Sequence, residues 1–79
     1  MFMGEKTYGE KVVGIDFNPS GDPIVHQLKT LFAKIVDLCE EERTKAGQGE
    51  KTGVLTEAIS HTLTAQMWTV KGVTWKNEI

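Results

Sequence analysis

The sequence predicts an all-α fold: an antiparallel helical hairpin that follows an irregular N-terminal arm and assembles into a compact homo-oligomer. Two apolar patterns of helical spacing predict two long helices, and the short polar loop 48–51 between them predicts that the second turns back on the first. The 79 residues are expected to form a single helical domain, 1–79. The expected parts are an arm at 1–15, a turn at 16–23, and helices at 23–47 and 52–75.

The segment before the first long helix is expected to lack regular structure. Gly4, Gly9 and Gly14 interrupt the arm, and the residues of 16–23 are mostly turn formers. Asp22 followed by Pro23 is a strong helix start, because the Asp carboxylate can accept from the open amides of the first turn while Pro lacks an amide that would be unpaired there.

The first long helix carries two adjoining apolar stripes and is expected to end at Gly47. The stripes are Ile24, Leu28, Leu31, Ile35 and Leu38, and Val25, Phe32, Val36 and Cys39. Together they form a face wider than one partner helix can cover. We therefore expect other copies of the chain to cover it, with Phe32, Met67 and Trp68 in the core or the oligomer interface.

The second long helix has one apolar stripe, which includes a polar residue. Its members are Leu55, Ala58, Ile59, Leu63, Gln66, Met67, Val70 and Val73. The segment 70–74 has poor helix propensity, because it contains Gly72 and three β-branched residues, so the end of this helix is the least defined by the sequence.

Composition excludes several classes of protein. Nine Lys plus Arg against eleven Asp plus Glu give a net charge of −2, whereas a usual DNA-binding domain carries a basic stripe. No apolar run approaches the ~20 residues of a membrane span. The first residues lack the pattern of a secretion signal, and the single cysteine suits a reducing compartment, so we expect a cytoplasmic protein that binds neither DNA nor membranes.

No arrangement of residues predicts catalysis, a cofactor or a metal. The segment 46–52 shares glycines and a Lys-Thr pair with a P-loop, but Glu50 stands where that motif needs glycine. His26 and His61 have no third ligand at metal-binding spacing, and the consecutive carboxylates 40–42 point in different directions on a helix. Cys39 lies on an apolar face, where a thiol behaves as a small hydrophobe. We expect no enzyme.

A binding surface remains. Phe17 and Asn18 precede the Pro19 turn, and Lys29 lies about two turns into the following helix. These groups could offer a π-face for a base, an amide for its edge and an ammonium for a phosphate. On spacing alone, the alternative that Phe17 packs onto the helix and Lys29 is solvated is favoured.

Three segments, 17–25, 28–29 and 64–71, change this interpretation. They read FNPSGDPIV, LK and TAQMWTVK. This pattern resembles a family of small bacteriophage proteins, the second anti-CBASS type, which are sponges for the cyclic oligonucleotide signals of bacterial immunity. The resemblance covers about residues 16 to 76, and the Ala-Gln-Met-Trp stretch is its most distinctive part.

The resemblance implies an all-helical homohexamer that holds cyclic dinucleotides at subunit interfaces, with cyclic trinucleotides in separate pockets of some members. It also implies that the aromatic before the proline turn, Phe17, stacks on a base. Asn18 then lies close to the ligand, with Pro19 and Ser20 in the same turn, and Lys29 contacts a phosphate. The family aromatic is often Tyr, so a hydroxyl contact is missing here.

The function implied is that of a phage-encoded sponge, which sequesters cyclic dinucleotides such as 3′,3′-cyclic GMP-AMP, and cyclic trinucleotides, without cleaving them, and so blocks CBASS immunity in the cytoplasm of the infected host. The alternative is a small helical protein-interaction adaptor, of phage or bacterial origin, with no nucleotide ligand. Its wide apolar faces would then dock onto another protein.

Overall fold

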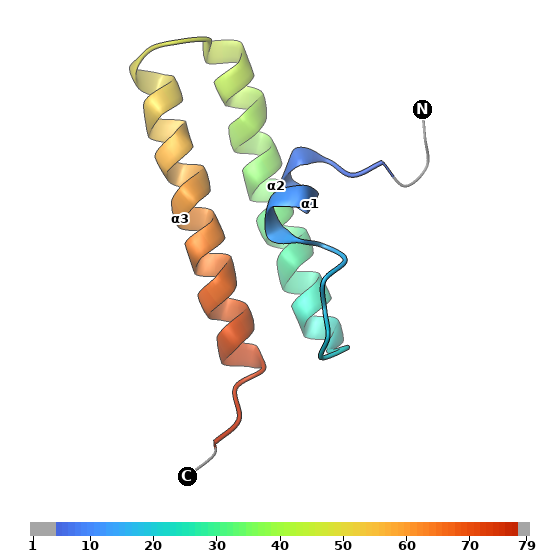
Figure 1. Cartoon of the computed structure of the whole chain (residues 1–79). Helices are drawn as coiled ribbons and strands as arrows, with labels where there is room; N and C mark the ends of the chain where they lie inside the picture. Colours follow the sequence, from blue (N-terminus) through green and yellow to red (C-terminus); the bar gives the residue numbers. More distant parts are fainter. Residues whose placement is uncertain (1–4, 78–79) are drawn as a thin grey trace.

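The structure, a computed structural model, describes residues 5–77 and is all-α within them, as the sequence predicts. Its elements are α1 (Tyr8–Val13), α2 (Pro23–Ala46) and α3 (Glu50–Val73). Figure 1 shows α2 and α3 side by side, running in opposite directions, and the short α1 packs mainly against α2.

The first long helix, α2, starts and stops at residues suited to those positions. The Asp22 carboxylate accepts from the Ile24 amide at 2.9 Å, and Pro23 occupies the first turn. At the other end Gly47 has a φ of 70° and its amide donates to the Arg43 carbonyl. The range predicted from sequence, 23–47, differs from α2 by one residue.

The second long helix, α3, lies two residues earlier at each end than the predicted range 52–75. Gly49, with a φ of 130°, reverses the chain just before Glu50, so the helix starts directly after the turn without a side-chain cap. The negative charge of Glu50 in the first turn interacts favourably with the positive end of the helix dipole. The helix ends at Val73, inside the segment 70–74 that has poor helix propensity.

The expectation of an irregular arm at 1–15 is wrong for part of it, because residues 8–13 form α1. Thr7 and Glu10 make a capping box: each side chain accepts a hydrogen bond from the backbone amide of the other. Gly14, with a φ of 64°, ends the helix in a left-handed conformation. The rest of the arm that the structure describes, 5–7, has no regular structure, and 1–4 lie outside the described residues.

The short helix α1 packs on α2 through a glycine. The Gly9 amide donates to Asp37 Oδ1 at 2.6 Å, and a Cβ at Gly9 would stand 2.1 Å from the Ala33 carbonyl oxygen. Only glycine allows the two backbones to approach this closely.

Gly9→Ala should therefore push α1 off α2 and lower the free energy of unfolding by about 1–3 kcal/mol. Thermal unfolding followed by circular dichroism measures this. Gly53→Ala is the matched control: a Cβ there meets nothing within 4 Å, so this change within α3 should stabilise the chain by about 0.5–1 kcal/mol. Equal melting temperatures for Gly9→Ala and the wild type would show that α1 does not pack as described.

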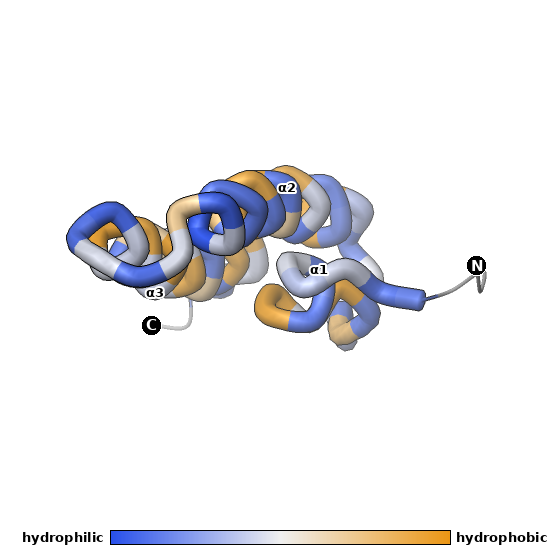
Figure 2. Tube along the Cα trace, turned by 90° about the horizontal axis from the view of Figure 1, so that it is seen from above, coloured by the Kyte–Doolittle hydropathy of each residue, from blue (hydrophilic) through white to orange (hydrophobic). Residues whose placement is uncertain are grey.

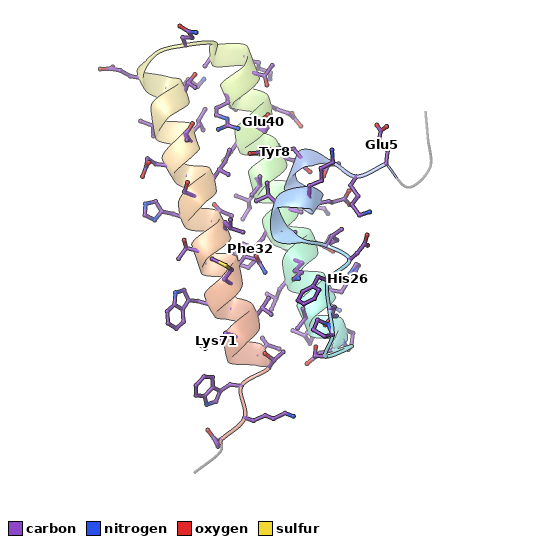
Figure 3. The ribbon with its side chains drawn as sticks, in the orientation of Figure 1. Glu5, Tyr8, His26, Phe32, Glu40 and Lys71 are labelled. Atoms are coloured by element: carbon purple, nitrogen blue, oxygen red, sulfur yellow. The ribbon has the colours of Figure 1, made fainter. Side chains whose placement is uncertain are left out.

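Arg43 joins all three helices near the end of α2. Its guanidinium donates to Glu40 Oε1 at 2.6 and 2.9 Å and to Thr56 Oγ1 of α3 at 3.1 Å, and it lies 5.9 Å from the centre of the Tyr8 ring of α1. Figure 3 shows Tyr8 and Glu40 at this level of the molecule. The hydrogen bonds to Glu40 raise the pKa of Arg43 above its usual value.

The core is small, and the molecule is thin. Its Cα atoms extend over 49 × 34 × 12 Å, so the helices form little more than one layer (Figure 2). The buried apolar side chains are Val13, Val25, Ala33, Val36 and Ile59. One layer of helices cannot enclose the remaining apolar residues.

One of the two predicted stripes of α2 is therefore largely uncovered. Ile24, Leu31, Ile35 and Leu38 are 46–62% exposed, whereas Val25 and Val36 of the other stripe are buried. Of the side chains expected in the core or an interface, Phe32 is half-buried. Met67 and Trp68 are 55% and 67% exposed, so neither belongs to the core of the single chain.

Candidate functional site

The turn between α1 and α2 is held by its own side chains. Asn18 Nδ2 donates to the Asp22 carbonyl at 3.0 Å, and Asn18 Oδ1 accepts from Ser20 Oγ at 2.7 Å. Ser20 Oγ also accepts from the Asp22 amide at 3.1 Å. Because hydroxyl and amide groups at these spacings replace backbone partners, the turn has a defined shape before any ligand arrives.

Lys29 ties this turn to α2. It is 5% exposed, and its Nζ donates to the Gly14 carbonyl at 3.0 Å and to the Phe17 carbonyl. Burial lowers the pKa of the Lys29 amine, while the carbonyl acceptors stabilise its ammonium form. With two of its three donors occupied, one N–H remains for a further acceptor.

Phe17 is the exposed aromatic of the turn. Its side chain is 71% exposed, and Lys29 Nζ lies 5.4 Å from the ring centre, within cation–π distance. The ring therefore neither packs as a staple onto the helix nor stands alone. The buried Lys29 ammonium lies against the ring, and most of the surface of the ring is exposed to solvent.

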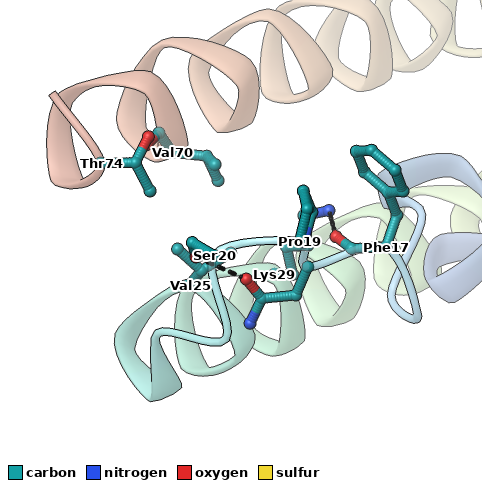
Figure 4. Close-up of a pocket in the computed structure, with 8 residues that line it drawn as sticks. Phe17, Pro19, Ser20, Val25, Lys29, Val70 and Thr74 are labelled. Atoms are coloured by element: carbon teal, nitrogen blue, oxygen red, sulfur yellow. Dashed lines mark hydrogen bonds between the residues drawn. The ribbon is translucent and has the colours of Figure 1, made fainter.

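These predicted site residues line one hollow of about 160 Å³ between the turn and the C-terminal end of α3 (Figure 4). Phe17, Asn18, Pro19, Ser20, Val25 and Lys29 form one side. Val70 of α3 and Thr74, the residue that caps its C-terminal end, form the opposite side, and sequence reasoning did not assign either to a site. The hollow thus combines an aromatic ring, a polar turn and a cation with an apolar wall.

Comparison with known families, curated proteins and solved structures finds no match for this chain.

Asn18 and Ser20, which the sequence analysis places near a ligand, also stabilise the turn itself. Their side chains bond within the turn, so they fix its shape, and each keeps only spare capacity for a ligand. Lys29 likewise holds the turn in addition to facing the hollow. Sequence spacing could not show these roles, because they depend on which carbonyls fold back over α2.

A second, wider hollow of about 660 Å³ adjoins the first and shares Phe17, Lys29 and Val70 with it. Its further polar lining comes from Lys11, Gln66 and Lys71. Sequence reasoning missed these residues as a site. The one available signal was Gln66, a polar residue on the apolar stripe of the second long helix.

The residues considered for metal or acid–base chemistry do not gather. Within 5–77, no group of three His, Cys, Asp or Glu side chains is placed to hold a metal ion. His26 and His61 are both exposed, on different helices, and His61 Nε2 lies 3.7 Å from Glu57. In the same range, no helix is long and apolar enough to cross a membrane.

Proposed function

We propose that this chain is a phage-encoded sponge that binds cyclic dinucleotides and holds them uncleaved, and so blocks CBASS immunity. The proposal rests on the resemblance of segments 17–25, 28–29 and 64–71 to the anti-CBASS family. The observation that carries it is the hollow in which Phe17, Asn18, Pro19, Ser20 and Lys29 lie together.

The chemistry of this hollow suits a nucleotide. A base stacks on the open face of Phe17, which Lys29 supports from the other side. The remaining N–H of Lys29 donates to a phosphate oxygen. The turn binds the ligand at little entropic cost, because its own hydrogen bonds already hold its shape.

The size of the hollow favours a half-site. Ligand pockets usually enclose about 300–1,000 Å³, and the 160 Å³ that one chain provides in this hollow is smaller than that. A cyclic dinucleotide is nearly two-fold symmetric, and a two-fold interface presents each side chain twice. One ligand then occupies two hollows from two copies.

The energies are of the right order for such a site. Two base stacks contribute about 1–3 kcal/mol each and two charged phosphate contacts about 1.5–3 each. Nanomolar binding needs about 12 kcal/mol. The preformed turn reduces the gap between the summed contact energies and the energy that nanomolar binding needs, because little conformational entropy is lost on binding.

We propose in addition that the chain, a helical hairpin, assembles into a compact homohexamer. The uncovered stripe of α2, together with Met67 and Trp68, supports this, because burying each large apolar side chain contributes about 1.5–3 kcal/mol before the entropy of association is subtracted. The lone thiol, Cys39, suits the reducing cytoplasm of an infected host.

Assembly is tested by size-exclusion chromatography with light scattering. The wild type should elute as a hexamer at micromolar concentration, and Trp68→Ala should shift the mass toward smaller species with helix content unchanged. Val54→Ala is a suitable control, since Val54 is also exposed, at 68%, but lies outside the predicted interface. A monomeric wild type would contradict the proposed assembly.

The same exposed apolar residues also fit the second candidate, a protein-interaction adaptor. A thermal-shift panel of cyclic di- and trinucleotides separates the two functions, since a ligand that binds only the folded chain raises the melting temperature by an amount that grows with the logarithm of its concentration relative to Kd. The sponge predicts a clear rise with cyclic dinucleotides. An unchanged melting temperature with every cyclic nucleotide, together with a stoichiometric protein partner, would select the adaptor.

A further inference from the structure

The wider hollow next to Phe17 contains a polar side chain with no assigned role. Gln66 is only 5% exposed, and its side chain makes no hydrogen bond to any residue in 5–77. Every fully buried side-chain nitrogen or oxygen in that range has a partner. The terminal amide of Gln66 must therefore reach the surface of the hollow, where its donor and acceptor are open to a ligand.

We propose that Gln66 reads the edge of an adenine base and makes the chain prefer cyclic di-AMP over cyclic di-GMP. This rests on the proposed function, because the ligand is the one whose base stacks on Phe17. Phe17, Lys29 and Val70 line both hollows, so a base on the Phe17 ring directs an edge into the hollow that holds Gln66.

The preference follows from hydrogen-bond chemistry. Adenine presents a donor, the N6 amino group, beside an acceptor, N7, and a glutamine amide matches this pair with its own acceptor and donor. Guanine presents two acceptors at the same edge, O6 and N7, so the amide oxygen of Gln66 would face an oxygen.

The charge around Gln66 suits the phosphates of such a ligand. The charged residues that line the hollow are Lys11, Lys29 and Lys71, with no carboxylate among them. Neither Lys11 nor Lys71 forms an ion pair with a residue that the structure describes. Lys71 Nζ lies 5.5 Å from the centre of the Trp68 ring and 5.9 Å from that of Trp75, which limits the positions it samples.

The test compares cyclic di-AMP and cyclic di-GMP by isothermal titration calorimetry on the wild type and on Gln66→Leu. Leucine keeps the apolar volume and removes the amide. The wild type should prefer cyclic di-AMP, and Gln66→Leu should lose about tenfold in affinity for it while cyclic di-GMP is little affected. Gln48→Leu, which removes an exposed amide from the loop before α3, should bind both like the wild type.

Each other outcome is decisive. Equal wild-type affinities for the two ligands would overturn the proposed role of Gln66, and so would wild-type affinity for cyclic di-AMP in Gln66→Leu. In either case, the proposed sponge function is retained if Phe17→Ala still loses binding. A wild type that binds neither these nor any other cyclic nucleotide would overturn both proposals. If Gln66→Leu does not fold, as judged by its helical circular dichroism, Gln66→Glu provides the same comparison, and its carboxylate should weaken cyclic di-AMP at least as much.

Discussion

Phe17→Ala should weaken cyclic dinucleotide binding at least tenfold, since base–aromatic stacking contributes about 1–3 kcal/mol per base and a two-fold site loses two stacks. The ring is 71% exposed, so its removal should leave the helix content and the melting temperature nearly unchanged. Calorimetry gives the affinity, and circular dichroism gives the helix content.

Two controls sharpen this result. Phe17→Tyr keeps the ring and should bind at least as well as the wild type. Tyr8→Ala removes an exposed aromatic on α1 that lies against Arg43 and lines neither hollow, so it should leave the affinity unchanged. Full affinity in Phe17→Ala would remove Phe17 from the site.

Lys29→Met should have the second large effect, on both stability and binding. Methionine retains much of the length and apolar volume of the side chain but cannot donate to the Gly14 and Phe17 carbonyls or support the Phe17 ring. Loss of hydrogen bonds to a charged group should lower the free energy of unfolding by about 1.5–3 kcal/mol. Affinity for a cyclic dinucleotide should fall by about 10- to 100-fold, with a weaker dependence on salt.

The matched control is Lys34→Met, also on α2. Lys34 is exposed and lines neither hollow, so the change should leave stability and affinity close to those of the wild type. Denaturant unfolding and calorimetry at two salt concentrations measure both quantities. A destabilised Lys29→Met that binds normally would assign Lys29 to the turn alone and contradict its contact with phosphate.

Much of the fold follows from local signals in the sequence. Asp22 and Pro23 define the start of α2, and Gly47 its end, because capping is decided within a few residues. The two residues of the capping box of α1, Thr7 and Glu10, can also be read in the sequence at the spacing that this motif requires. The glycines at 4, 9 and 14 led the sequence analysis to expect no helix there, but Gly9 lies within α1 and makes a contact with Ala33 that only the folded chain provides.

The site was less accessible to sequence reasoning for a related reason. Phe17 and Lys29 stand out by type and spacing, but the bonds from Lys29 to the Gly14 and Phe17 carbonyls span 15 and 12 residues. The opposite wall is formed by Val70 of α3 and by Thr74 just after this helix, more than forty residues further along the chain. Such contacts depend on tertiary packing, which propensity and periodicity do not encode.

The most direct test of the central claim is calorimetry of the wild type with 3′,3′-cyclic GMP-AMP, followed by heating and chromatography of the ligand. We predict saturable binding at one ligand for two chains and recovery of the intact cyclic dinucleotide. Absence of binding heat across cyclic di- and trinucleotides, or recovery of a linear product, would contradict the proposal that this chain sequesters such ligands without cleaving them.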